Sequence, residues 1–188
     1  MSVKPLNRST VKSSANPAGS TIQRFHASTI VILNRQRTKK INVRFLRQIV
    51  AVLFVELDLA GAELGICLVG APEMTRLNET FLRHAGSTDV ITFDYSVPKP
   101  RTRDPRPKIH GEIFVCVDEA VVQARKFGTS WPSELVRYVV HGTLHLTGHD
   151  DRRPAVRREM KREENRLLGR LSRRFALAQL SRPVRITA

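Results

Sequence analysis

The sequence predicts a single globular domain built of both strands and helices, and three observations favour this organisation. Four short runs rich in β-branched residues are interspersed with about five segments whose apolar residues recur at helical spacing. The length of 188 residues suits one domain with an adequate core and short tails. No apolar run approaches the roughly 18 residues that a membrane span needs. We therefore expect a globular protein that does not enter a membrane.

The first half of the chain is predicted to supply structural elements. Residues 28–33 (STIVIL) and 64–69 (LGICLV) read as strands, because they are short, apolar and rich in β-branched residues. Residues 43–59 form a helix that Asn42 can cap. A second helix begins at Pro72, with inner residues Met74, Leu77, Phe81 and Leu82. The tail over residues 1–20 is basic and rich in Ser, Asn and Pro, so we expect it to be disordered.

The second half of the chain continues this mixture. Strands are predicted over residues 87–95 and 111–117, and the proline-rich stretch 97–110 between them is predicted to be a loop. A helix over 119–127 is expected to be capped by Asp118, and the next begins at Ser130 and Pro132. The last helix runs from Pro154 to about Leu180. Its outer face is expected to carry Arg157, Lys161, Arg162, Arg166 and Arg173. The predicted domain covers residues 21–180, and 181–188 form a C-terminal tail.

One motif, HGTLHLTGHDD over residues 141–151, predicts a metal site. His141 and His145 are four residues apart, so on a helix their side chains share one face. Gly148 is suited to end that helix and to turn the chain back towards the imidazoles. A third ligand ten residues after the first matches the spacing of metzincins, and that position is Asp151. Two imidazoles and a carboxylate form a catalytic type of zinc set that leaves a position for water.

The same motif resembles the metal motif of the YbeY family, rRNA maturation factors described as metal-dependent endoribonucleases. The usual pattern of that family is HGxLHLxGxDH, in which His141 and His145 match and the third histidine falls on Asp151. Either Asp151 replaces it or His149 takes its place by a local shift. We favour Asp151, which keeps the loop length and offers a carboxylate that zinc accepts. Residues 87–95 and 111–117 resemble two strands of the family, and the resemblance covers roughly residues 28–170.

The resemblance implies an α+β, zincin-like fold with a small four-stranded mixed sheet packed by about five helices. It implies a single-strand-specific endoribonuclease with one zinc ion, acting in 3′-end maturation of small-subunit rRNA and in ribosome quality control. The partner would be the ribosomal small subunit. An arginine common in the family aligns with Leu82, one residue before Arg83. Arg83 is therefore a candidate for phosphate contact, with a solvated cation at a helix end as the alternative.

The charge distribution favours RNA as a partner. The net charge is +15, with ten basic and no acidic residues in 1–55 and twelve basic against three acidic in 152–188. A polyanion is the natural partner of such ends. The two cysteines, Cys67 and Cys116, lie in apolar strand-like runs, which indicates buried thiols in a reducing compartment. We therefore expect the protein to be cytoplasmic.

Two other functions share parts of this pattern. A zinc peptidase has the same pair of histidines, but its general-base glutamate follows the first of them, where this chain has Gly142. A non-catalytic rRNA-binding assembly factor, stabilised by zinc, would also have basic ends. Because Gly142 cannot move a proton, Tyr138, Asp150 and His149 are unranked candidates for that role.

Overall fold

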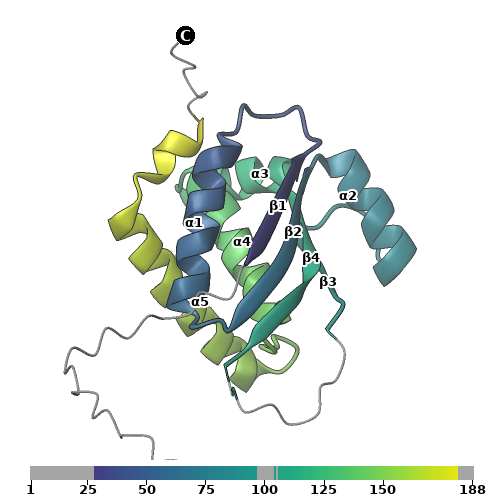
Figure 1. Cartoon of the computed structure of the whole chain (residues 1–188). Helices are drawn as coiled ribbons and strands as arrows, with labels where there is room; N and C mark the ends of the chain where they lie inside the picture. The colour runs from purple at the N-terminus through teal and green to yellow at the C-terminus, as the bar shows by residue number, and fades with distance from the viewer. Residues whose placement is uncertain (1–27, 97–103, 105, 182–188) are drawn as a thin grey trace, which may run out of the picture.

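In the computed structural model, which describes residues 28–96, 104 and 106–181, a four-stranded mixed sheet forms the centre (Figure 1). The strands are β1 (Thr29–Asn34), β2 (Gly61–Val69), β3 (Val90–Asp94) and β4 (Lys108–Cys116), and they lie in the order β1-β2-β4-β3. β1, β2 and β4 are parallel, whereas β3 is antiparallel to β4. β3 therefore begins beside the end of β4, where Cys116 N–H donates to the Asp89 carbonyl at 2.9 Å.

Five α-helices surround this sheet: α1 (Val43–Glu56), α2 (Ala71–Leu77), α3 (Val117–Phe127), α4 (Trp131–Leu146) and α5 (Pro154–Arg174). α1, α4 and α5 lie on one side of the sheet and α2 on the other (Figure 1). A π-helix, η1 (Asn78–Leu82), follows α2, and a 3-10 helix, η2 (Leu177–Ser181), follows α5. The predicted α+β fold with a four-stranded mixed sheet and five helices is confirmed.

Alternation along the strands divides the interior into two clusters. Ile66 and Leu68 of β2 pack into the larger cluster with α1, α4 and α5. Cys67 and Val69 face the opposite way and pack with Met74 of α2. Successive side chains of a strand point to opposite faces of the sheet, which explains this division. Both cysteines are buried free thiols, as predicted.

α4 runs through the middle of the larger cluster, and its contact with the sheet depends on a glycine. A Cβ added at Gly142 would lie 2.8 Å from Ile113 Cγ2 of β4 and 3.2 Å from Thr92 Cγ2 of β3. The helix therefore approaches the sheet at a distance that only glycine permits. The predicted start of this helix is confirmed, and Ser130 caps it, because its hydroxyl accepts a hydrogen bond from Ser133 N–H at 3.4 Å.

Four predictions about these elements are wrong. α5 ends at Arg174, because Phe175 has an extended backbone with φ −127° and ψ 130°. Asp118 lies inside α3 rather than capping it, and its carboxylate instead accepts from Ala71 N–H at 2.6 Å at the start of α2. Phe81 and Leu82, predicted on the inner side of the second helix, are exposed. The chain enters η1 there, and the buried residue of η1 is Asn78. The last part of the predicted loop, residues 108–110, belongs to β4.

None of the described helices is long and apolar enough to cross a membrane. The predicted disordered tail over 1–20 lies outside the described residues, as do 182–188 and most of the stretch 97–105. Ser181, expected in the C-terminal tail, belongs to η2. The domain limits at 21 and 180 stay a prediction.

Candidate metal centre

The two motif histidines lie on one face of α4 with their rings close together. The ring centroids are 4.7 Å apart and the planes are nearly perpendicular, at 83°. His141 Nε2 and His145 Nε2 are 3.1 Å apart. The spacing of four residues on a helix thus brings the two imidazoles to one point, as the sequence predicted.

Each imidazole is held through its other nitrogen. His141 Nδ1 lies 3.1 Å from Glu164 Oε2, and His145 Nδ1 lies 3.1 Å from the backbone carbonyl of His149. An ionised carboxylate and a carbonyl only accept hydrogen bonds, so both Nδ1 atoms carry the proton. This leaves a lone pair on each Nε2, which is the tautomer that metal-binding histidines adopt.

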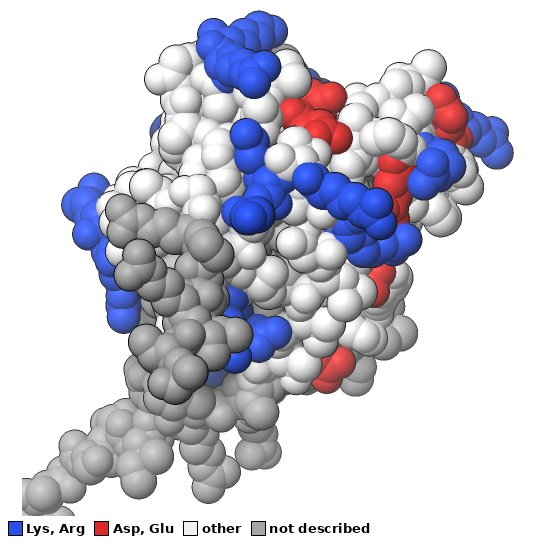
Figure 2. All heavy atoms as spheres, turned by 90° about the horizontal axis from the view of Figure 1, so that it is seen from above, with Lys and Arg blue, Asp and Glu red and all other residues white. Residues whose placement is uncertain are grey.

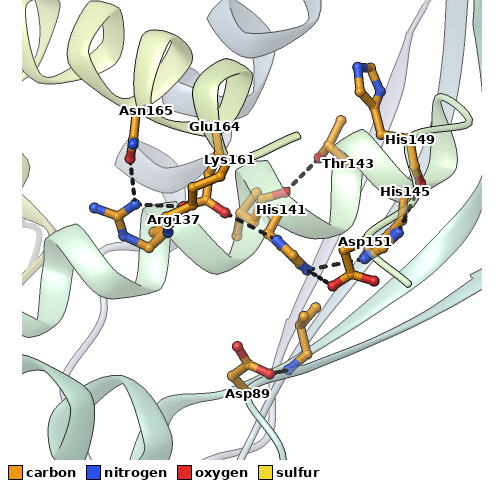
Figure 3. A network of polar contacts seen from close by, with 12 residues as sticks. Asp89, Arg137, His141, Thr143, His145, His149, Asp151, Lys161, Glu164 and Asn165 are labelled. Atoms are coloured by element: carbon orange, nitrogen blue, oxygen red, sulfur yellow. Dashed lines mark hydrogen bonds and ion pairs between the residues drawn. The ribbon is translucent and has the colours of Figure 1, made fainter. Parts of the chain in front are cut away.

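The turn after α4 brings a carboxylate to the same point (Figure 3). Gly148 has φ +94°, a left-handed conformation that glycine adopts without strain. Asp151 Oδ2 lies 3.9 Å from His141 Nε2, and one ligand atom each from His141, His145 and Asp151 all lie within 4.8 Å of one another. The His149 ring points away, with Nδ1 3.2 Å from the Thr147 hydroxyl and 3.3 Å from the Leu144 carbonyl.

This donor set fits a divalent cation. Two Nε2 lone pairs that face each other at 3.1 Å repel unless a cation or a proton lies between them. Zinc takes nitrogen and carboxylate ligands at about 2.0–2.2 Å, which places tetrahedral donor atoms roughly 3.3 Å apart. The separation of the two Nε2 atoms, 3.1 Å, is close to this value, and Asp151 Oδ2 lies somewhat farther out, at 3.9 Å from His141 Nε2. These three residues could therefore hold one metal ion, with room for a further ligand.

Buried charge surrounds the first imidazole. Burial raises the pKa of Glu164, but hydrogen bonds from His141, Lys161 and Arg137 outweigh it and lower that pKa to about 2. Lys161 Nζ is 2.7 Å and Arg137 Nη1 is 2.5 Å from Glu164 Oε1. Burial and the neighbouring His141 lower the pKa of His145 below the ordinary value of 6.5. Both effects favour ionised Glu164 and neutral His145 at pH 7, the states that suit metal binding.

The cluster opens into a cleft of about 560 Å³. The cleft lies between α3, the same face of α4 and the first half of α5, with the start of β3 at one side. His141 and Asp151 line it, together with Asp89 of the segment before β3. Arg137, Arg157 and Lys161 also line it, so basic groups stand beside the cluster. A ligand that carries both negative charge and polar groups suits such a lining.

The other candidate residues lie as follows. Tyr138 is buried at the cleft, and burial raises the pKa of its hydroxyl, so it cannot act as a base near neutral pH. Asp150 lies outside the cluster and accepts from Arg152 N–H at 3.2 Å. Arg83 ends η1 with φ +58° and is exposed. Among the described residues no polar contact joins Arg83 to the cluster, so its predicted role in phosphate contact stays a prediction.

The sequence interpretation missed Glu164 and misplaced two cations. Glu164 lies in the buried stripe of α5 between Met160 and Leu168, and a glutamate at such a position is the signal that could have identified it. Arg157 and Lys161, predicted on the outer face, point to the cleft instead. Arg157 Nε donates to the Asp151 carbonyl at 2.7 Å. Lys161 is directed there by its ion pair with Glu164, and Arg157 by its hydrogen bond to the turn after α4. Helical periodicity does not reveal such contacts.

Comparison with known proteins gives one consistent result. A family model described as Endoribonuclease YbeY matches residues 27–172. A relative of that name from Myxococcus xanthus is 39% identical over 115 residues, which cover 61% of this chain and 38% of that protein. Another, from Salinibacter ruber, is 38% identical over 106 residues, covering 56% of this chain and 68% of that protein. A solution structure from Thermotoga maritima, 24% identical, shares the fold with a TM-score of 0.57 over 85% of this chain and 99% of its own. The chain belongs to the Endoribonuclease YbeY family.

Proposed function

We propose that this protein is a metal-dependent endoribonuclease that binds one zinc ion through His141, His145 and Asp151. The observation that carries the proposal is the pair of Nε2 lone pairs facing each other at 3.1 Å, each fixed by a hydrogen bond at Nδ1. Only a cation or a shared proton relieves that arrangement, and Asp151 adds the negative charge that a cation attracts. The name of the relatives supports RNA as the substrate.

The residues around the metal would have separate roles in phosphodiester cleavage. Zinc in such a site polarises a phosphoryl oxygen and activates water. Glu164 holds the His141 ring and its tautomer, so that the metal position is set before substrate arrives. Lys161 and Arg157 line the cleft beside the cluster, where they can bind phosphate groups of the RNA backbone.

The proposed substrate is a single-stranded segment at the 3′ end of small-subunit rRNA, and the proposed setting is ribosome maturation and quality control in the cytoplasm. The net charge of +15 supports binding to RNA. Figure 2 shows many basic side chains on the end of the fold that carries the loop between β1 and α1. Exposed Arg37, Lys40 and Arg44 lie in or next to that loop. The buried free thiols of Cys67 and Cys116 suit a reducing compartment.

The peptidase alternative is disfavoured by the packing of α4. The residue after the first histidine would have to carry the general base, but a side chain at Gly142 would point into Ile113 and Thr92 of the sheet. That position therefore faces the core rather than the metal. The non-catalytic alternative differs from our proposal in one measurable way, because it needs zinc for stability and not for cleavage.

The test compares His145→Ala with His110→Ala, a histidine exposed on β4 and distant in sequence from the cluster. Zinc content is measured by mass spectrometry, and cleavage and binding are measured with a labelled single-stranded rRNA fragment. We expect His145→Ala to lose zinc and cleavage while keeping most RNA affinity, since that affinity resides in Lys and Arg. His110→Ala should keep all three. Full cleavage by zinc-free His145→Ala would exclude the metal mechanism.

A further inference from the structure

The cleft beside the metal cluster has two walls of different chemistry. The α5 wall carries the cations Arg157 and Lys161. The α3 wall carries Glu119, Gln123 and Phe127, which are spaced four residues apart and so share one helical face. A phosphate is attracted to the first wall, whereas the carboxylate of Glu119 repels it from the second. The α5 wall therefore suits the phosphate backbone of a nucleic acid, and the α3 wall suits its bases.

Phe127 at the end of the α3 wall is unusually exposed for a large apolar side chain. It is 64% exposed and is the last residue of α3, which ends at Gly128 with φ +65°. Lys126 Nζ lies 5.5 Å from the centroid of its ring. By contrast, exposed Phe81 packs edge-on against Phe93, with centroids 5.0 Å apart. Within the described part of the chain, no other aromatic ring is recorded against the ring of Phe127.

The position of Phe127 along the cleft fixes which nucleotide it can meet. α4 starts at Trp131, just after Phe127, and His141 lies ten residues further along the helix. At 1.5 Å per residue, Trp131 and His141 are therefore about 15 Å apart along α4. That distance exceeds the step between neighbouring nucleotides of a helical strand, about 3.4 Å. Because Phe127 lies next in the chain to the start of α4, we expect a base on its ring to belong to a different nucleotide from the one beside His141.

We propose that Phe127 is a stacking platform for a base of single-stranded RNA, whose backbone lies along the α5 wall and whose base edges face Gln123 and Glu119. This inference rests on the proposed endoribonuclease function. Aromatic side chains bind bases of any sequence by stacking, and cations track the phosphates. A base within a duplex is already stacked and paired, so it cannot lie on Phe127. The platform thus gives the site a physical reason to prefer single strands.

The test compares Phe127→Ala and Phe127→Trp with Phe81→Ala, a matched exposed phenylalanine that does not line this cleft. The probe is a single-stranded RNA oligonucleotide with 2-aminopurine at successive positions, whose fluorescence is quenched on stacking. Binding is measured with a chelator present, so that no cleavage occurs. Thermal unfolding checks that every variant is folded, which we expect because both side chains are exposed.

We expect Phe127→Ala to weaken binding about 5- to 150-fold, the range given by loss of one base–aromatic stack. The quench should disappear at one probe position, and the dependence of affinity on salt should stay unchanged because no phosphate contact is lost. Phe127→Trp should restore affinity and quench, and Phe81→Ala should match the wild type. Unchanged affinity and quench in Phe127→Ala, with cleavage by the wild type intact, would overturn the platform and leave the nuclease standing. A quench that depends on Phe127 in a protein that never cleaves would support the platform and refute the nuclease.

Discussion

Replacing Glu164 with glutamine tests the link between the buried charge and the metal site. The side chain of Glu164 is 4% exposed and contacts three donors, on His141 at 3.1 Å, Lys161 at 2.7 Å and Arg137 at 2.5 Å. Glutamine keeps the shape but removes the charge and one acceptor. The His141 ring then loses its charged partner, and loss of such a partner typically weakens metal binding about 10- to 100-fold.

The same change should destabilise the protein in a way that depends on pH. The pKa of Glu164 is lowered from 4.5 to about 2, which corresponds to about 3 kcal/mol of stability at neutral pH. Because the pKa of the folded state is the lower one, this contribution is present above pH 4.5 and is lost as the pH falls towards 2. The difference in unfolding free energy between wild type and variant should therefore shrink on acidification.

Two assays measure these effects. Competition with a chromophoric chelator gives the zinc affinity, and denaturant unfolding with chelator present gives the stability at neutral and acidic pH. Glu163→Gln is the matched control, since Glu163 precedes Glu164 on α5 and pairs with Arg166 instead. Equal zinc affinity in Glu164→Gln and Glu163→Gln would refute the positioning role of Glu164. A stability difference that does not change with pH would refute the electrostatic explanation.

Three further outcomes are expected. Zinc affinity should be constant above pH 7 and fall as the pH drops below 6.5, the ordinary pKa of histidine, because the lowered pKa of His145 keeps its ring neutral down to that pH. Chelator competition across this pH range measures the affinity. A fall in affinity that begins well above pH 7 would contradict this prediction. Asp151→Asn should lose zinc by metal analysis while His149→Ala retains it, and the reverse result would move the third ligand to His149. Gly142→Ala should lower the stability by about 1–3 kcal/mol in denaturant unfolding, because its Cβ meets Ile113 Cγ2 at 2.8 Å; an unchanged midpoint would show that the helix can shift.

Local patterns along the chain were enough to predict most elements and the approach of His141, His145 and Asp151 to one another. The four strands were found from β-branched runs, and the spacing of His141 and His145 placed both rings on one face because helical geometry is nearly invariant. The cap at Asn42 and the helix start at Ser130 were also predicted, since a cap depends on residues only three positions away. Features that depend on residues close together in the chain could therefore be predicted from the sequence.

Features that depend on contacts between distant segments were not accessible. Asp118 looked like a cap, but its carboxylate bonds Ala71, 47 residues away. Glu164 meets His141 across 23 residues, and the direction of Lys161 follows from that contact. The strand order, in which β4 lies between β2 and β3, also has no local signal. These errors arose because residue spacing along a helix does not reveal which partner another helix will bring.

The left-handed turn at Gly148 separates the proposed ligands into two kinds. His141 and His145 project from a helix that packs tightly on the sheet, so the packing of the interior fixes where their rings lie. Asp151 lies in the chain after the turn, and its side chain is 42% exposed against 22% for His141. In the proposed metal site, such a residue could be exchanged while α4 and the sheet keep their packing, which accords with an aspartate where the family's usual pattern has a histidine.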